Sequence, residues 1–197
     1  MIRIAASGPT PALALRPWAP EDIPALIKAH ADPAMRRWLM RHIADEGQAL
    51  AALADQQRDW DAGTRFTFAV LRAVAVDADN GDVDNADVDN EGRAAGEPIG
   101  SVSIRRLAKD PDAAEVGYWT AAEARGKSVA LRAVEGVLAW SESAWSEDPV
   151  SRFNLIHTLG NDASCRVAIK LGFKLAEDLP AYPPKFPEPG HLHVRQR

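Results

Sequence analysis

The chain has 197 residues, of which 46% are hydrophobic and 26% charged, values typical of a globular protein with a proper core. We therefore expect one domain over residues 1–197, without a membrane span or a secretory signal. The net charge is −5, but residues 77–95 carry seven acids and one base, so the rest is nearly neutral and does not suggest a nucleic-acid surface. The single cysteine, Cys165, excludes an internal disulfide and fits a reducing cytoplasm.

The front of the chain predicts one strand followed by helices. Residues 1–11 suggest a loose leader, and residues 13–18 form a strand that prolines stop. A helix opens at residues 19–23, breaks at residues 32–33, and continues in a piece that carries Met35, Trp38 and Leu39. A third helix over residues 46–62 ends at Gly63. We interpret Trp60 as a core residue.

Two strands are predicted over residues 65–76 and 97–107, with an acidic segment between them. This segment, about residues 77–95, contains the near-repeat GDVDN and ADVDN and too few apolar residues to fold alone. It lacks the twelve-residue spacing and closing Glu of a calcium loop. We therefore predict a disordered hairpin insertion.

A strand, a polar turn and an amphipathic helix occupy residues 114–138. The strand covers residues 114–119, the turn residues 120–125, and the helix starts near Gly126 or Lys127. Residues 125–128 are thus placed at a helix N-terminus, where unpaired N–H groups suit a phosphate and Gly126 permits close approach. An ordinary strand–turn–helix is the alternative interpretation of this spacing.

The segment Arg125-Gly126-Lys127-Ser128-Val129-Ala130 resembles the acyl-CoA pyrophosphate loop of the GNAT N-acetyltransferase superfamily. Ser128 stands where that family usually has an inner glycine, and we expect serine to fit there in a helical conformation. A second segment, residues 161–173, resembles the family pattern N-x-x-S followed by A-x-K-L-G-F. Asn161 or Asp162 is expected to cap its helix, and Gly172 to end it.

The resemblance implies an α/β (α+β) fold, with a mixed, mostly antiparallel sheet of about six to seven strands flanked by helices. It implies direct transfer of an acetyl group from acetyl-CoA, the co-substrate, to a primary amine. The layout is most similar to the branch that acetylates the N-termini of ribosomal proteins, so the amine is a protein N-terminus or a small molecule. It also allows a homodimer, with no nucleic-acid or membrane partner. The alternative is a non-catalytic acyl-CoA-binding or regulatory module, which the serine at position 128 favours.

The resemblance also assigns residues. Glu115 is the expected base for the amine, and Ser164 the expected proton donor to the leaving thiolate, with Tyr182 as the other candidate. Ser164 has the equal alternative of capping its helix. Trp38 and Tyr182 are expected on the substrate side. The expected cofactor-binding residues are Trp119, Thr120, Arg125, Gly126, Lys127, Ser128, Val129, Ala130, Asn161 and Ser164. A backbone amide near residues 116–119 is expected to serve the oxyanion.

The C-terminal part predicts two short strands around an irregular segment. Residues 173–176 begin one strand, residues 179–190 contain five prolines, and residues 191–195 form a last strand. His191 and His193 share one face of it, but two histidines seldom make a metal site. We interpret them as surface or structural residues and expect no metal.

Overall fold

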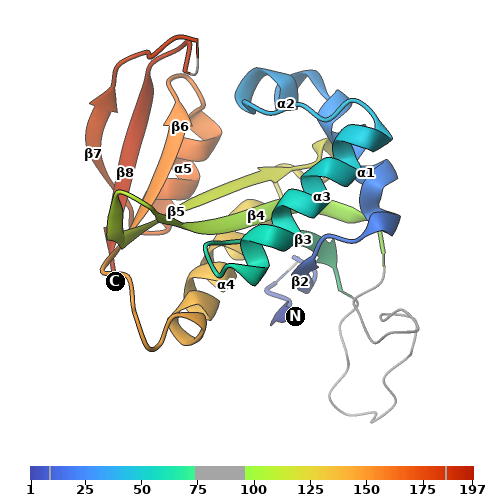
Figure 1. Cartoon of the computed structure of the whole chain (residues 1–197), viewed down its shortest axis with the longest axis horizontal. Helices are drawn as coiled ribbons and strands as arrows, with labels where there is room; N and C mark the ends of the chain where they lie inside the picture. The colour runs from blue at the N-terminus through green and yellow to red at the C-terminus, as the bar shows by residue number, and fades with distance from the viewer. Residues whose placement is uncertain (9, 74–95, 185) are drawn as a thin grey trace.

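A computed structural model describes residues 1–8, 10–73, 96–184 and 186–197, so the predicted acidic insertion at 77–95 lies outside the described residues. The described chain forms an open eight-stranded sheet in the order β1-β2-β3-β4-β5-β6-β8-β7 (Figure 1). Its strands are β1 Ile2–Ile4, β2 Leu13–Pro17, β3 Arg65–Arg72, β4 Pro98–Leu107, β5 Asp110–Thr120, β6 Arg152–Thr158, β7 Lys174–Leu179 and β8 Gly190–Gln196. Neighbours are antiparallel except for β5 and β6, which are parallel. The predicted mixed, mostly antiparallel sheet is confirmed, with eight strands where six to seven were expected.

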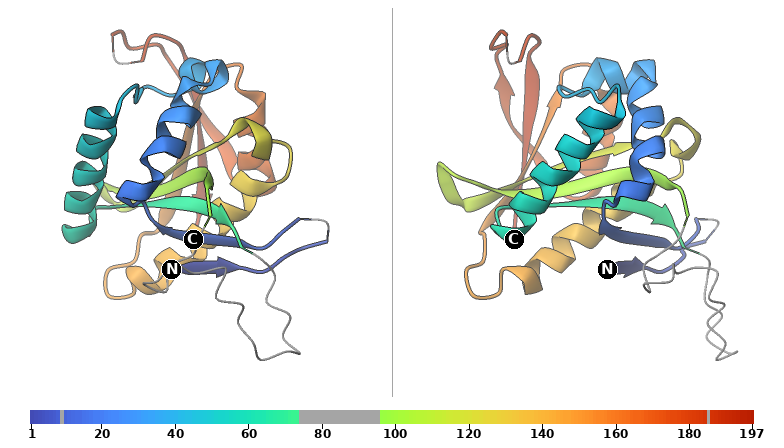
Figure 2. Two further views of the ribbon diagram at one scale, coloured as in Figure 1. Left: turned by 90° about the vertical axis from the view of Figure 1, so that its right-hand side faces the viewer. Right: turned by 45° about the vertical axis from the view of Figure 1, so that its right-hand side comes forward.

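Helices cover both faces of the sheet (Figure 2). The helical elements are η1 Pro20–Asp22, α1 Ile23–Ala31, α2 Pro33–Trp38, α3 Glu46–Asp61, η3 Ala122–Ala124, α4 Val129–Ala144 and α5 Asp162–Lys170. The α1–α3 segment lies on one face, and α4 and α5 lie on the other. No helix among the described residues is both long and apolar enough to cross a membrane.

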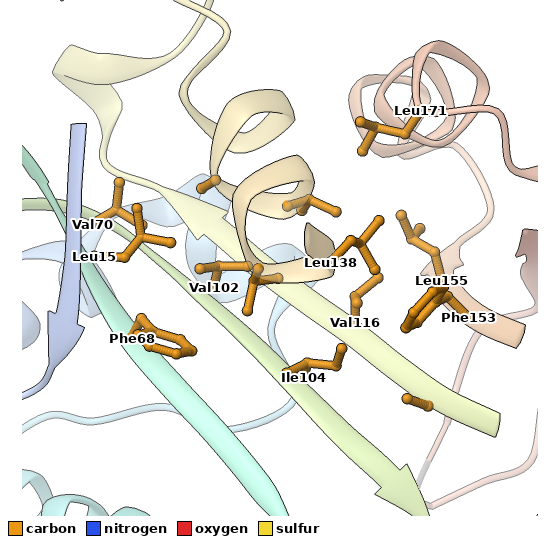
Figure 3. Packing of buried hydrophobic residues seen from close by; sticks show 14 of the residues in the cluster. Leu15, Phe68, Val70, Val102, Ile104, Val116, Leu138, Phe153, Leu155 and Leu171 are labelled. Carbon is orange, nitrogen blue, oxygen red and sulfur yellow. The ribbon is translucent and has the colours of Figure 1, made fainter. Parts of the chain in front are cut away.

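The main core lies between α4 and the sheet (Figure 3). Alternate residues of neighbouring strands point to this face, including Phe68 of β3, Val102 of β4 and Val116 of β5. Val134 and Val137 of α4 meet them and are fully buried. Each such side chain contributes about 1.5–3 kcal/mol by leaving water. The helix that the apolar spacing predicted after residue 129 therefore packs over the central strands.

The N-terminal segment is ordered, contrary to the expected loose leader. Strand β1 pairs with β2 at the sheet edge and contacts α4. The buried side chain of Arg132 donates hydrogen bonds to the carbonyl oxygens of Ala5 and Pro11, and its contact with Pro11 is 2.6 Å. Contacts from a distant helix therefore help to hold this segment at the sheet edge.

The pairing of β5 with β6 stops halfway along β5. The parallel register ends at Val116 and Leu155, whereas β5 stays paired with β4 up to Thr120. In Figure 1, β6 turns away from β5 beyond this point. The second half of β5 consequently has an open edge on its β6 side.

Candidate functional site

A pocket of about 430 Å³ lies where β5 and β6 separate. A volume of this size is within the range of small-ligand sites. Its walls come from α2, the end of β5, the loop before α4, the start of α4, and α5. The lining residues are Ala34, Met35, Trp38, Leu39, Tyr118, Trp119, Thr120, Ala124, Arg125, Gly126, Ser128, Val129, Ala130, Leu131, Asn161, Ala163, Ser164, Arg166, Val167 and Lys170.

The structure brings most of the expected site residues together. All expected cofactor-binding residues except Lys127 line the pocket, as do Ser164 and Trp38. Lys127 is exposed, and its Nζ atom donates to the carbonyl oxygen of Glu123 at 2.9 Å, which closes the short η3 turn. Tyr182 is 70% exposed and does not line the pocket. Glu115 also lies outside the lining.

The loop before α4 differs in one respect from the expectation. The helix begins at Val129, and Gly126 and Ser128 both have left-handed backbone, with φ of 73° and 56°. Ser128 is the one non-glycine residue with positive φ in the described part of the chain, so the expected helical serine is wrong. A glycine adopts this conformation without a Cβ penalty, whereas a serine pays about 1–2 kcal/mol. The two left-handed residues turn the chain into α4, whose first residues, Val129 and Ala130, line the pocket.

The strained position gives a stability prediction. Changing Ser128→Gly is expected to raise the free energy of unfolding by about 0.5–1 kcal/mol, because relief of the left-handed strain exceeds the entropy that glycine gains when unfolded. Urea denaturation measures this change. The matched control is Ser143→Gly in α4, where a helical position makes glycine destabilising. A Ser128→Gly variant that is less stable than the parent contradicts the assignment of strain to this residue.

Arg125 connects the loop to the opposite wall. Its guanidinium forms an ion pair with Asp32, the N-cap of α2, and its Nε donates to the carbonyl oxygen of Thr120 at 3.3 Å. Burial acts to raise the pKa of Asp32, but the Ala34 amide and the Arg125 guanidinium together hold that pKa below its ordinary value. Asp32 therefore stays a carboxylate at neutral pH and fixes Arg125 at the pocket rim.

The pocket lining is cationic. Arg125, Arg166 and Lys170 line it, Arg125 in its ion pair with Asp32 at the rim, and no Asp or Glu is among the lining residues. Arg166 and Lys170 lie four residues apart on α5 and so share a helix face. The sequence analysis did not assign Arg166 and Lys170 to the site. Ala163, Arg166, Val167 and Lys170 recur every three or four residues, and this spacing could have placed the two cations on the helix face that lines the pocket. Together with the helix start, this charge suits a polyanionic ligand such as the diphosphate of an acyl-CoA.

Ser164 lies in the first turn of α5, lines the pocket and is hydrogen-bonded to the N-cap residue of the helix. The Oδ1 atom of Asn161 accepts a hydrogen bond from the Ser164 backbone N–H at 3.2 Å, so Asn161 is the cap and the Ser164 hydroxyl is not used for this purpose. Gly172 follows the helix end with φ of 78°, as expected for a C-terminal cap.

Tyr118 is a pocket residue that the sequence analysis did not assign. Its hydroxyl is buried and has no hydrogen-bond partner of normal geometry within the described structure. Burial raises the pKa of Tyr118 to about 12, and the nearby Ser164 hydroxyl partly opposes this rise. The phenol therefore stays protonated at neutral pH, as an unused donor that faces the ligand space beside Ser164.

Glu115 lies on the face of β5 that is opposite to Val116 and Tyr118. Its Oε1 atom accepts hydrogen bonds from Nη2 and Nε of Arg105 at 2.9 and 3.2 Å. The Glu115 side chain is 24% exposed, so water reaches it. It stands one residue before the end of the β5–β6 pairing, on the side of the sheet that carries α1 and α3.

Aromatic side chains form the wall on this second side. Trp119 of β5 lines the pocket and packs against Trp18, with ring centroids 5.8 Å apart, and against His30 at 5.9 Å. Trp38 of α2 also lines the pocket, and the Arg37 guanidinium lies 4.4 Å from its ring centroid. Trp60 packs on the main core, as expected.

Comparison with known proteins agrees with this geometry. The sequence matches the acetyltransferase (GNAT) domain family over residues 12–174. No curated protein matches the sequence. Three solved structures illustrate the likeness of fold, with identities too low to show more than the fold.

An acetyltransferase from Salmonella typhimurium that modifies the N-terminal serine of ribosomal protein L7/L12 aligns with a TM-score of 0.69 and 14% identity over 96% of both chains. RimJ from Mycobacterium smegmatis, in complex with CoA-disulfide, aligns with a TM-score of 0.70 and 16% identity, covering 94% of this chain and 82% of its own. The microcin C7 self-immunity acetyltransferase MccE, in complex with acetyl-CoA and AMP, aligns with a TM-score of 0.68 and 13% identity, covering 94% of this chain and 92% of its own.

The family match spans most of the chain, and the eight-stranded sheet and its solved neighbours share one architecture. The protein therefore belongs to the GNAT acetyltransferase family and is an acyltransferase that transfers an acetyl group from acetyl-CoA to an amine.

Proposed function

We propose that the pocket holds acetyl-CoA and that the acceptor is the primary amine of a peptide N-terminus or a small molecule, brought in from the side of α1 and α2. The observation that carries this proposal is the cationic pocket at the separation of β5 and β6, which has three lining cations and no lining acid. The lining offers Ser, Tyr, Asn, Arg and Lys side chains and no His, Cys or carboxylate, so we propose no metal in this pocket. A reducing cytoplasm suits the single cysteine.

The residues at the pocket supply distinct parts of the proposed reaction. Gly126 and Ser128 turn the chain so that the N–H groups at the start of α4 bind the diphosphate, with Arg125 at the rim. The unpaired β6-facing edge of β5, beyond Val116, provides backbone amides for the oxyanion. Tyr118 and Ser164 donate a hydrogen bond or proton to the departing thiolate, and the pKa of about 12 keeps the Tyr118 proton in place.

Glu115 is proposed as the base, acting through water because its side chain does not line the pocket. An α-amine has a pKa of about 7.7–8.0, so much of it is protonated at neutral pH and a base is useful. Asn154 lies opposite Glu115 in the parallel register, and its buried Oδ1 atom has no partner within the described structure. We propose that a water held between these two side chains carries the proton.

The change Glu115→Gln is expected to lower kcat about tenfold at pH 7 and progressively less as the pH rises, because the amine then loses its proton unaided. Steady-state rates across a pH series measure this trend. The control is Glu142→Gln, an exposed residue of α4 away from the pocket lining. A loss that is equal at every pH assigns Glu115 a structural role with Arg105.

The alternative, a non-catalytic acyl-CoA-binding module, rests on the strained Ser128 in the loop. One experiment separates the two functions. The protein is titrated with acetyl-CoA while thiol release is followed over a panel of amines, including peptides with free N-termini and peptides whose N-termini are blocked. Turnover on free N-termini supports the proposed substrate, turnover on small amines alone redirects it, and tight binding without turnover on any amine supports the module.

A further inference from the structure

A second cluster of reactive side chains lies away from the pocket, between α5 and the β6–β8 pair. It contains three histidines and the single cysteine: His157 of β6, Cys165 of α5, and His191 and His193 of β8. One ligand atom of each lies within 4.8 Å of those of the other three. None of the four lines the pocket described above.

Of the two alternatives for the strand histidines, surface or structural, burial rules out the surface one for His193. His193 is only 2% exposed and His157 only 8%. The pairing of β6 with β8 places His157 directly opposite His191, a contact between residues far apart in the sequence. The spacing of His191 and His193 alone therefore contained only half of the cluster.

In two of the histidines, the ring nitrogen that points away from the cluster (the outer nitrogen) faces an oxygen acceptor. His157 directs Nδ1 at the carbonyl oxygen of Thr158, at 3.0 Å, so this nitrogen carries the hydrogen and Nε2 is an acceptor that faces Nε2 of His193. His191 directs Nε2 at Oδ1 of Asp178, at 3.4 Å. Its Nδ1 is buried and has no hydrogen-bond partner among the described residues. A backbone carbonyl and a carboxylate that fix the outer nitrogen are the usual supports of metal-binding histidines.

One pair of facing ligand atoms has the separation expected in a tetrahedral site. The Nε2 atoms of His157 and His193 are 3.2 Å apart. Two nitrogens bound to one Zn²⁺ at about 2.0–2.1 Å in tetrahedral geometry are separated by about 3.3–3.4 Å. The longest separation within the cluster, at most 4.8 Å, closes with small side-chain rotations. Without an ion, the buried Nδ1 atom of His191 has no hydrogen-bond partner among the described residues, which costs about 1–3 kcal/mol.

We propose that His157, Cys165, His191 and His193 form a Zn²⁺ site that fastens α5 to β6 and β8. Four protein ligands complete a tetrahedral shell and leave no open position, which is the arrangement of a structural site. Binding releases the thiol proton of Cys165 and moves the hydrogen shared by the two Nε2 atoms to Nδ1 of His193. The thiolate and the outer carboxylate of Asp178 then balance the two charges of the ion. The site steadies the helix that carries Ser164 into the pocket.

The test uses the full chain after a chelator has removed bound metal. A reductant that is not itself a thiol keeps Cys165 reduced, so that no added thiol competes for the metal. Titration with Zn²⁺ is expected to give one site per chain and a rise in Tm of about 5–10 °C at 100-fold excess over Kd. Titration with Co²⁺ is expected to give the thiolate charge-transfer band and the visible bands of a tetrahedral complex. Acetyl-CoA binding measured in parallel confirms that the chain is folded.

Three variants decide the outcome. Cys165→Ser is expected to abolish the charge-transfer band, and Asp178→Asn to weaken Zn²⁺ binding about tenfold through the lost support of His191. His42→Gln, an exposed histidine outside the cluster, is expected to leave Zn²⁺ affinity unchanged. Folded parent protein that binds no Zn²⁺, or a Cys165→Ser protein that keeps the full affinity and spectrum, overturns the proposal.

Discussion

Replacing Tyr118 by Phe is expected to lower kcat about 100-fold while leaving the KM for acetyl-CoA nearly unchanged. Among the described residues the Tyr118 hydroxyl has no hydrogen-bond partner of normal geometry, and it lies at the pocket wall near Ser164, so the group that it serves is absent until the thiolate begins to leave. An interaction made only in the transition state affects kcat and not ground-state binding. Steady-state kinetics at saturating amine measure both constants.

The same substitution is expected to stabilise the folded protein. A buried hydroxyl without a partner costs about 1–3 kcal/mol, and phenylalanine keeps the ring while removing this group. Thermal or urea unfolding is therefore expected to show a slightly more stable variant with much lower activity. This opposite movement of stability and rate separates a catalytic hydroxyl from a structural one.

The pH dependence distinguishes Tyr118 from Glu115. Because the pKa of Tyr118 is about 12, the phenol is protonated throughout the working range, and the loss in Tyr118→Phe is expected to be equal from about pH 6 to 9. The loss in Glu115→Gln is expected to shrink over the same range. Ser164→Ala is the matched control, and a double substitution shows whether the two hydroxyls act together. An unchanged kcat in Tyr118→Phe together with a large loss in Ser164→Ala assigns the proton donor to Ser164 alone.

Local patterns in the sequence were sufficient for the elements that carry the site. The α5 segment illustrates this, because Asn161, Ser164 and Gly172 are a cap, a pocket residue and a C-terminal glycine in one continuous motif. The strands predicted over residues 65–76 and 97–107 likewise correspond to β3 and β4, which cover Arg65–Arg72 and Pro98–Leu107. These features depend on neighbours in sequence, and such neighbours determine caps and strand faces.

Features that depend on distant pairing were not accessible in this way. Val116 and Tyr118 share one face of β5, yet Tyr118 reaches the pocket only because β6 separates from β5 after Val116. The histidine cluster likewise requires the pairing of β6 with β8. At Ser128 the local rule itself failed, because serine was expected to follow the helix and instead adopts the conformation that glycine provides at no cost.

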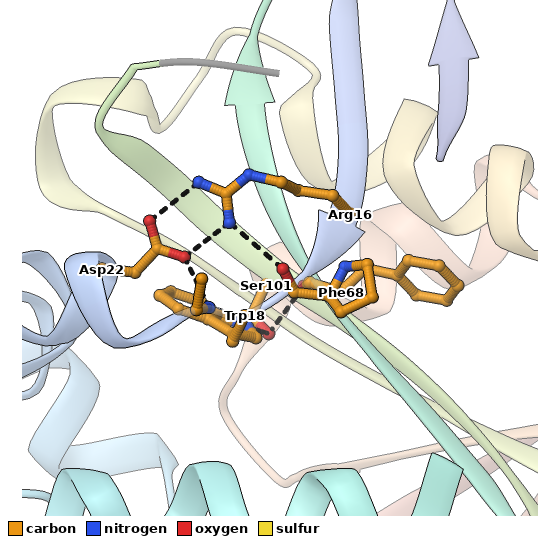
Figure 4. Close-up of polar contacts among 7 residues, drawn as sticks. Arg16, Trp18, Asp22, Phe68 and Ser101 are labelled. Atoms are coloured by element: carbon orange, nitrogen blue, oxygen red, sulfur yellow. Dashed lines mark hydrogen bonds and ion pairs between the residues drawn. The ribbon is translucent and has the colours of Figure 1, made fainter. Parts of the chain in front are cut away.

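Replacing Asp22 by Ala is expected to lower the free energy of unfolding by about 3–5 kcal/mol, because it leaves the buried guanidinium of Arg16 without its carboxylate. The two side chains are 3% and 6% exposed and form two hydrogen bonds, of 2.6 and 2.9 Å (Figure 4). Asp22 also accepts from the Ala19 backbone N–H at 2.9 Å, which fixes the turn from β2 into α1. Urea denaturation measures the loss, and Tm is expected to fall by about 10 °C.

Two further variants test whether the charge or the shape of this pair matters. Asp22→Asn keeps an acceptor oxygen and is expected to lose less than Asp22→Ala. The double change of Arg16→Met with Asp22→Leu removes both charges and is expected to recover most of the stability, because apolar replacement of a buried ion pair is often neutral. A single-variant loss below about 1 kcal/mol contradicts a buried, desolvated pair.

The position of this pair links stability to the pocket. Trp18 lies between Arg16 and Asp22 in the sequence, donates from Nε1 to the Ser101 hydroxyl at 3.3 Å, and packs on Trp119 in the pocket wall. Ser101 in turn donates to the Phe68 carbonyl oxygen at 3.1 Å, so the residue that follows β2 is linked to β4 and β3 (Figure 4). In the fraction of protein that stays folded, Asp22→Ala is therefore expected to weaken amine binding, which is measured as a higher KM for the amine. The KM for acetyl-CoA is expected to change little, because it depends on the opposite wall of the pocket.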